Sequence, residues 1–309
     1  MKHFWEDKKD LADDWSHLHV EISQASDPGI YAQTGGNHRL KLLLDGHPFL
    51  WACIAADYWD CEVLVDLDGF STSQVVIPPI RAQDLRLAAT GPHQGPAFWT
   101  RFFFQKLAES SFHFLYAGMW HLYTLREKYP SQVLLTSASY TIALGFGEPA
   151  ILPLKSKPDV QSARVKWWRK KVREGTCPPL FVWFHSGVQA YLLVDGHSRL
   201  EAHLLEGKRP QIIAIASVKE VTYPKDPKVQ MHIQTAIEER NKHRYKRPLS
   251  TAETNQLLLQ TYDNRPHTLR INRAVARRDF EEQWVQEVRD FGKKWSLDSE
   301  LIEGIIERA

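Results

Sequence analysis

The residues best suited to chemistry in this 309-residue chain lie in a nine-residue stretch, LLVDGHSRL, at Leu192–Leu200. A carboxylate, a glycine, an imidazole, a hydroxyl and a guanidinium follow one another from Asp195 to Arg199. A second stretch, LLLDGHPFL at Leu42–Leu50, has the same Asp-Gly-His sequence after a similar apolar run. The residues that follow each copy predict different structures and different roles.

The first copy is predicted to be a β-turn. Asp45-Gly46 separates two strand-like runs, and Asp-Gly is a strong hairpin signal because both central residues of a type I′ turn need positive φ. Pro48 excludes a helix interior at this point, since proline lacks a backbone N–H and clashes with the preceding turn. This copy is therefore expected to have a structural role.

In the second copy the pattern changes from strand to helix, with Leu200 and Leu204 on one apolar stripe. Gly196 is therefore expected where a buried strand breaks into a helix, whose first backbone amides lack intrahelical partners. These amides and the helix dipole favour an anion such as a phosphate. Ser198 can donate its hydroxyl, and Arg199 can contact two phosphate oxygens at once.

Asp195 would repel a bare phosphate. Its expected role is to coordinate a metal ion or to accept a proton from an attacking hydroxyl group. The alternative is structural: Asp195 caps the helix, while His197 and Arg199 are solvated. Spacing alone does not choose between these two interpretations.

The elements before this stretch are predicted to be strands followed by one long helix. The strand-like runs RLKLLL, FLWACIAA and CEVLVDL fall within residues 39–79. The aromatic segment over about residues 97–128 has a period near that of a helix. Its most apolar part, Phe112–Leu125, is too short to span a bilayer and is expected to be a buried helix. A strand-like run, QVLLTSASYTIALGF, follows it.

The segment around the second copy is predicted to run strand, helix, hairpin, helix, strand. AILPL is the first strand, and a helix over residues 161–174 ends at Gly175, which suits a left-handed C-terminal cap. The strands LFVWF and AYLLV flank a polar turn. A second helix, ending at Gly207, leads to the strand QIIAIASV.

The ordered set of residues in this segment resembles the ParB/sulfiredoxin-like superfamily. The resemblance covers about residues 148–220. The "DGxxR" form of the turn is nearest to the free-serine-kinase branch, whereas sulfiredoxins carry their catalytic cysteine where this chain has His197. The matching positions are Gly175, Pro178, Pro179, Val182, Asp195, Gly196, Arg199, Ala202 and Gly207.

The resemblance implies a nucleotide-binding domain that takes a nucleoside triphosphate, ATP or CTP, with Mg²⁺. The phosphates would be held by Gly196, His197, Ser198 and Arg199. Asp195 would hold Mg²⁺ or the acceptor, His197 would lie in the catalytic turn, and Asp159 would be a candidate base. The implied reaction is phosphoryl transfer to a small hydroxyl compound, or nucleotide hydrolysis.

A DNA-binding or nuclease protein of ParB-like type is the alternative. Between Arg240 and Arg247, basic residues are interleaved with an aromatic one, and this pattern suits contact with a phosphate backbone. A further basic segment, RINRAVARRDF, is expected to place Arg270, Arg273 and Arg277 on one helical face. A third hypothesis is a degenerate fold used for protein interaction. The candidate nucleic-acid contacts are Arg240, Lys242, Arg244, Lys246 and Arg247.

The chain as a whole is expected to have an α+β fold in three parts: an α+β region (1–146), the nucleotide-binding domain (147–222) and a helical basic region (223–309). In the last, Ser250 and Glu253 have the spacing of a capping box. Its other predicted helix has an apolar stripe of Phe280, Trp284 and Val288, with Phe291 beside it.

Composition limits where the protein acts. The net charge of +2 gives no global attraction to nucleic acid or to an anionic membrane. Three cysteines, two of which could meet across neighbouring strands, suit a reducing compartment better than a disulfide framework. With no apolar signal segment at the N-terminus, a cytoplasmic protein with no membrane partner is expected.

Overall fold

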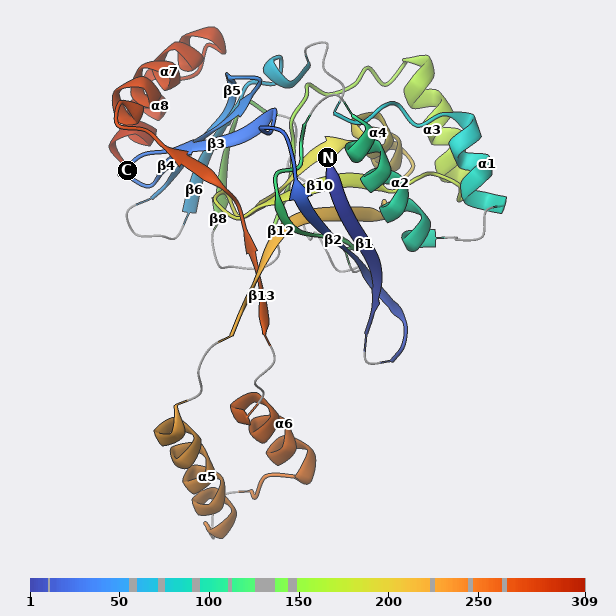
Figure 1. Ribbon diagram of the computed structural model, residues 1–309. Helices are drawn as coiled ribbons and strands as arrows, with labels where there is room; N and C mark the ends of the chain where they lie inside the picture. The colour runs from blue at the N-terminus through green and yellow to red at the C-terminus, as the bar shows by residue number, and fades with distance from the viewer. Residues whose placement is uncertain are drawn as a thin grey trace. The chain divides into compact units, whose positions relative to one another are not determined.

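The computed structural model describes residues 1–10, 12–55, 60–71, 76–90, 95–110, 113–125, 137–143, 149–222, 226–243, 247–262 and 266–308 (Figure 1). The fold is α+β, with two mixed sheets and helices packed against them. No helix in these ranges is long and apolar enough to cross a membrane. The chain divides into two compact units, residues 1–218 with 271–309 (unit 1) and residues 219–270 (unit 2).

Sheet A contains the strands that position the candidate site. Its order is β1-β2-β7-β12-β10-β11-β9, and β13 also pairs with β12. The β10–β11 pair is antiparallel, whereas β9–β11 and β10–β12 are parallel. The strands are β1 (Lys2–Lys9), β2 (Trp15–Gln24), β7 (Gly118–Thr124), β9 (Ile151–Pro153), β10 (Leu180–His185), β11 (Ala190–Asp195), β12 (Ile212–Val221) and β13 (His267–Ile271).

Sheet B has the order β14-β3-β4-β5-β6-β8. Asp45 and Gly46 connect β4 to β5 with φ values of 49° and 81°, so the predicted two-residue turn with positive φ at both positions is confirmed. The strands are β3 (Ile30–Thr34), β4 (Arg39–Leu44), β5 (His47–Ile54), β6 (Asp60–Val65), β8 (Ser139–Ala143) and β14 (Ala274–Ala276).

In chain order, the helices occur between these strands and after the last of them (Figure 1). They are α1 (Ala82–Thr90), α2 (Gly95–Glu109), α3 (Ala163–Arg173), α4 (His197–Leu205), α5 (Pro227–Lys242), α6 (Thr251–Tyr262), α7 (Phe280–Lys294) and α8 (Ser299–Glu307), with a 3₁₀ turn at Gly69–Ser71. The order β9, α3, β10, β11, α4, β12 confirms the predicted strand, helix, hairpin, helix, strand succession. Gly175 and Gly207 follow α3 and α4 with φ of 70° and 61°, as the cap prediction requires.

Two predicted helices are wrong. Phe112–Leu125 contains the strand β7, in which Trp120 and Leu122 are buried on one face and the alternate residues are less buried. Large apolar and aromatic residues on both faces hid this period-two pattern. The RINRAVARRDF segment forms β13 and β14, so its arginines do not share a helical face. There, pairing with β12 and β3 overrides the helical spacing.

One large core joins the regions that the sequence analysis separated at residue 146. Leu18 and Leu122 of sheet A, Leu50 of sheet B and Phe103 of α2 belong to the same buried cluster. The Phe103 ring stacks on Phe181 of β10, with their centroids 4.6 Å apart. Strands from residues 1–146 and 147–222 therefore share sheet A, and the three expected parts do not coincide with the two compact units.

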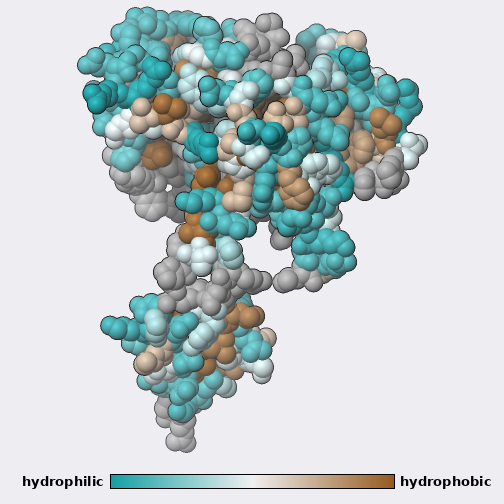
Figure 2. Space-filling model, viewed as in Figure 1, coloured by the Kyte–Doolittle hydropathy of each residue, from teal (hydrophilic) through white to brown (hydrophobic). Residues whose placement is uncertain are grey.

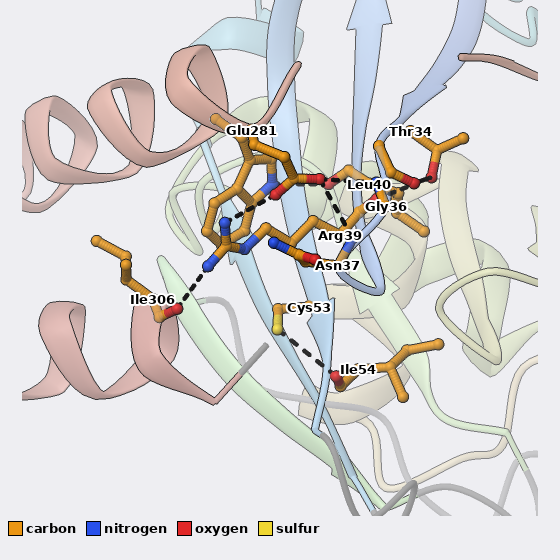
Figure 3. A network of polar contacts seen from close by, with 11 residues as sticks. Thr34, Gly36, Asn37, Arg39, Leu40, Cys53, Ile54, Glu281 and Ile306 are labelled. Carbon is orange, nitrogen blue, oxygen red and sulfur yellow. Dashed lines mark hydrogen bonds and ion pairs between the residues drawn. The ribbon is translucent and has the colours of Figure 1, made fainter. Parts of the chain in front are cut away.

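The C-terminal helices α7 and α8 cover the outer face of sheet B. The predicted stripe of Phe280, Trp284 and Val288 is confirmed as fully buried, and Phe291 is buried beside it. This face also holds paired charges, shown in Figure 3. The Arg39 guanidinium lies 2.8 Å from the Glu281 carboxylate and donates to the Ile306 carbonyl.

The same sheet buries a second cation. The Lys41 ammonium is 2.6 Å from the Glu287 carboxylate, and Glu287 also accepts the Trp51 indole N–H. Arg308 lies 2.6 Å from the buried Glu62. We call the paired groups at Arg39, Lys41, Glu62, Glu281, Glu287 and Arg308 the sheet B network. In this network every buried charge meets an opposite one.

Unit 2 is a helical hairpin in which α5 packs against α6. The predicted capping box is confirmed: Ser250 Oγ accepts from the Glu253 amide, and Glu253 accepts from the Ser250 amide. Among the described residues of this unit, Thr261 is the only one that is buried. Figure 2 shows hydrophobic residues at its surface. The exposed ones are Val229, Met231, Leu257, Leu259, Tyr262 and Leu269.

Candidate phosphate-binding pocket at the start of α4

The backbone at the end of β11 turns into α4 as the sequence predicts. Gly196 is the N-cap residue, with φ 113° and ψ 14°, and its carbonyl accepts the Leu200 amide at 2.7 Å. A Cβ at this position would approach the Leu180 side chain to 2.8 Å and the Arg199 guanidinium to 3.1 Å. Glycine is therefore required here both by conformation and by space.

A pocket of about 370 Å³ opens in front of this helix end. Segments far apart in the sequence supply its walls: the 3₁₀ turn and the chain after it, the loop after β9, α3, and the β11–α4 turn. Its polar lining residues are Lys155, Arg164, Asp195, His197, Ser198 and Arg199. Its other lining residues are Phe70, Val76, Ile77, Pro79, Trp168, Val194 and Gly196. We call it the α4 pocket.

Arg199 is not the solvated residue of the structural alternative. Its side chain is 1% exposed and its Nη2 donates to Asp195 Oδ2 at 2.7 Å and to the Pro179 carbonyl at 3.1 Å. The guanidinium lies over the Trp168 ring, 5.4 Å from the ring centre. Its Nε is buried and has no hydrogen-bond partner among the described residues. Arg199 therefore lies in the pocket lining as a buried cation that is held by Asp195 and the Pro179 carbonyl.

Two further cations of the pocket have no carboxylate within ion-pair distance among the described residues. The Lys155 ammonium lies 5.6 Å from the centre of the Phe70 ring. The Arg164 guanidinium lies 5.6 Å from the centre of the Trp168 ring. Burial lowers the pKa of Lys155, and the negative charge of Asp195 opposes that shift only in part. Aromatic faces stabilise these cations, but less than a carboxylate would.

His197 lies at the first helical position and is half-buried. Its Nε2 accepts a hydrogen bond from the Leu154 amide at 3.3 Å, so that nitrogen carries no proton. Burial, followed by the positive charge of Lys155, lowers the pKa of His197 to about 3. The imidazole is therefore neutral at pH 7. It anchors the loop after β9 to the helix end.

Asp159 is not brought to the pocket. It is exposed, its Oδ1 accepts from the Gln161 amide at 2.9 Å, and its carbonyl accepts from the Ser162 amide. Ser162 in turn caps α3 by accepting from the Val165 amide. The candidate base predicted from the sequence therefore belongs to the turn that begins α3, outside the lining of the α4 pocket.

The pocket residues do not fit a protein-held Mg²⁺. Asp195 is the only carboxylate among the described lining residues, and it accepts a hydrogen bond from Arg199. No group of three or more His, Cys, Asp and Glu side chains in the described ranges could hold a metal ion. Magnesium sites need oxygen ligands that are available for octahedral coordination. The metal role expected for Asp195 therefore has no support in this geometry.

Sequence reasoning found the turn but missed the residues opposite it. Lys155 and Arg164 lie in the segment LKSKPDVQSAR, which runs from the end of the strand AILPL into the predicted helix and to which no chemistry was assigned apart from Asp159. Phe70 and Ile77 come from a part of the chain to which no chemistry was assigned. A lysine two residues after the buried strand β9 was the available signal, because a charge at such a position needs a reason to stay near the core.

The candidate nucleic-acid residues lie in unit 2. Arg240 and Lys242 are exposed at the end of α5, and Lys242 lies 3.5 Å from Glu238. Arg247 lies 2.5 Å from Glu253. Arg244 and Lys246 lie outside the described residues. The described members of this set therefore have at least two acidic neighbours within unit 2.

The cysteines form no pair. Cys53, Cys61 and Cys177 are all free thiols. Cys53 is opposite Glu62 in the β5–β6 register, so the neighbouring Cys61 points to the other face of the sheet. Cys53 accordingly packs beneath α7 and α8, whereas Cys61 lies in the large core.

Comparison with known proteins gives no assignment for this site. No protein-family model matches the chain, no curated protein matches it, and no solved structure matches it. The ParB/sulfiredoxin-like resemblance therefore stays a prediction from the sequence motifs.

Proposed function

We propose that the α4 pocket binds the phosphate groups of a nucleotide. The observation that carries this proposal is a pair of cations in the pocket lining, the half-buried Lys155 and the exposed Arg164, that have no carboxylate partner among the described residues. The uncompensated charge of the half-buried Lys155 costs free energy that a bound anion recovers. The amides that begin α4 add a further attraction for phosphate.

The organic part of the ligand would meet the apolar wall of Phe70, Val76, Ile77 and Pro79. Ligand sites of this kind combine apolar walls with a few polar groups that fix orientation. Together with the "DGxxR" resemblance, this wall supports a nucleoside triphosphate, ATP or CTP, over a free inorganic anion. A reaction, phosphoryl transfer to a small hydroxyl compound or hydrolysis, is proposed on the resemblance, with Asp195 as the group that would accept the hydroxyl proton.

Thermal unfolding with ATP, ADP, CTP and GTP tests the binding. A ligand present at about 100 times its dissociation constant stabilises the wild-type chain by about 2.7 kcal/mol. Lys155→Gln and Arg164→Gln should each lose most of that stabilisation. Lys166→Gln is the matched control, because Lys166 is exposed on α3 and lies outside the pocket lining. If no nucleotide stabilises the wild type, or if all three variants respond alike, the proposal fails.

Asp195→Asn tests the reaction separately. If Asp195 accepts the proton, the variant should bind nucleotide and release no product, measured as phosphate or ADP formed with a panel of small hydroxyl compounds. Turnover by Asp195→Asn at the wild-type rate would remove Asp195 from the mechanism and leave the binding proposal standing.

Nucleic-acid binding by unit 2 is the second candidate, favoured by how the charge is distributed. Unit 2 contains ten Lys and Arg and six Asp and Glu residues, which gives it a net charge of +4. The whole chain has a net charge of +2, so the residues outside unit 2 have a net charge of −2. Binding of duplex DNA should weaken steeply as salt rises and should be lost in Arg240→Gln/Lys242→Gln. Lys166→Gln/Lys170→Gln, two exposed residues of α3, is the control. DNA binding that both double variants retain would exclude this surface.

The expected cytoplasmic location remains part of the proposal. It rests on the reducing compartment that the sparse free cysteines suit.

A further inference from the structure

We infer that the α4 pocket binds a phosphate dianion directly, without a protein-held divalent cation. This inference rests on the proposed function, because it concerns the same pocket and specifies the ionic form of the ligand. It departs from the Mg²⁺-dependent binding that the sequence resemblance implies.

The first step is the charge of the lining. Three cations, Lys155, Arg164 and Arg199, face one carboxylate, Asp195, and the half-buried His197 is neutral. The described lining therefore has a net charge of +2, to which the helix end adds a partial positive charge. A phosphate monoester or terminal phosphate with two negative charges balances this lining without a metal ion.

The second step is the buried charge of Arg199. Its side chain is 1% exposed and lines the pocket, and its Nη2 donates to Asp195 and to the Pro179 carbonyl. The guanidinium therefore acts on a ligand in the pocket mainly through its positive charge. A buried positive charge in the pocket wall favours an anionic ligand over a cation.

The third step concerns what a divalent cation would do. The one lining carboxylate, Asp195, accepts from Arg199 through Oδ2 at 2.7 Å, so only its other oxygen could hold Mg²⁺ while the ion pair lasts. A divalent cation on the phosphate would also compete with Lys155 and Arg164 for the same oxygens. In a pocket that is already positive, Mg²⁺ should therefore weaken binding rather than enable it.

Isothermal titration calorimetry of the full chain with pyrophosphate, and with ADP, tests this inference in excess EDTA and in excess Mg²⁺. We expect binding in EDTA, and a dissociation constant that rises by about threefold to tenfold when Mg²⁺ replaces EDTA. Binding that requires Mg²⁺, or that Mg²⁺ tightens or leaves unchanged, would overturn the inference while leaving the proposed function intact. An absence of binding in both buffers would overturn both.

Asp195→Asn gives a second, independent readout. Removing the one negative charge of the lining should tighten pyrophosphate binding in EDTA by about tenfold, since a like charge next to the anion is lost. Asp290→Asn, an exposed carboxylate on α7, should leave the constant unchanged. If the folded Asp195→Asn variant loses binding, Asp195 holds a cation and the inference is wrong. Should that variant fail to fold, the comparison of EDTA with Mg²⁺ on the wild type still decides.

Discussion

The sheet B network and the α4 pocket both hold cations near the core, and their surroundings differ. In the sheet B network, the Lys41 side chain is 3% exposed and lies 2.6 Å from the Glu287 carboxylate. In the α4 pocket, the half-buried Lys155 and the exposed Arg164 lie over aromatic rings, and no carboxylate of the described residues is within ion-pair distance. Cationic side chains are therefore neutralised by carboxylates in the sheet B network, whereas in the α4 pocket the positive charge of Lys155 and Arg164 remains available to a ligand.

The difference separates a structural use of buried charge from a ligand-binding one. A lysine and a glutamate that satisfy each other fix how α7 packs on β4, and they leave nothing for a ligand. A cation whose nearest described neighbour is a ring face keeps most of its attraction for an anion. Fold stability should thus depend on the network, and ligand affinity on the pocket.

Glu287→Ala should give the largest effect. It leaves the Lys41 ammonium buried without its partner and removes the acceptor of the Trp51 indole N–H. Breaking a buried pair from one side costs about 3 kcal/mol of unfolding free energy. Denaturant unfolding measures the loss, and the nucleotide affinity of the folded fraction should not change.

Glu282→Ala is the matched control on the same helix, because Glu282 is exposed. Its unfolding free energy should stay within about 0.5 kcal/mol of the wild type. A loss of unfolding free energy in Glu287→Ala no larger than in Glu282→Ala would mean that the sheet B network does not stabilise the fold. The contrast between a structural network and a ligand-binding pocket would then fail.

Local sequence signals predicted those elements whose period or turn chemistry is strong. The turn at Asp45-Gly46 could be predicted because its type depends on two adjacent residues. The break at Gly196 was also predicted, because the hydrophobic period changes from two to 3.6 there. By contrast, the sequence of β7 predicts a helix because its aromatic residues occupy both faces. Only pairing with β2 and β12 makes this segment a strand.

Only part of the candidate site could be predicted, because sequence signals are local. Asp195, Gly196 and Arg199 come from one turn, whereas Lys155 and Arg164 reach the pocket through the packing of β9 against β11 and of α3 against α4. Spacing along the chain does not encode such contacts. The Asp195–Arg199 ion pair was also missed, although the two residues are four apart, because each was assigned to the ligand instead of to the other.

A pH series sharpens the pocket side of the comparison, because the net charge of the lining assumes a neutral His197. Its folded pKa of about 3 lies below the ordinary value of 6.5. Above pH 6.5 the group is neutral in both states, and below it the unfolded chain binds a proton that the folded chain does not. This residue should therefore cost about 2 kcal/mol of unfolding free energy between pH 7 and pH 5.

His197→Asn should flatten the pH dependence by that amount. His47→Asn is the control, since His47 is the exposed histidine of the other Asp-Gly-His turn, and it should leave the slope as in the wild type. Equal slopes for all three proteins would show that folding does not lower the pKa of His197. The imidazole would then gain a proton as the pH falls through 6.5, and the lining would be more positive than two charges only at acidic pH.

Lys155→Met should give the smallest change in stability, and it tests the comparison most directly. Methionine keeps the length of the side chain and removes a charge that burial disfavours, so the unfolding free energy should stay constant or rise by up to about 1 kcal/mol. Nucleotide affinity should nevertheless fall about tenfold, since one charge-assisted phosphate contact is lost. Lys166→Met, at an exposed position of α3, should change neither quantity. A destabilisation of Lys155→Met by more than about 1 kcal/mol would instead place Lys155 with Lys41, as a cation that the fold itself needs.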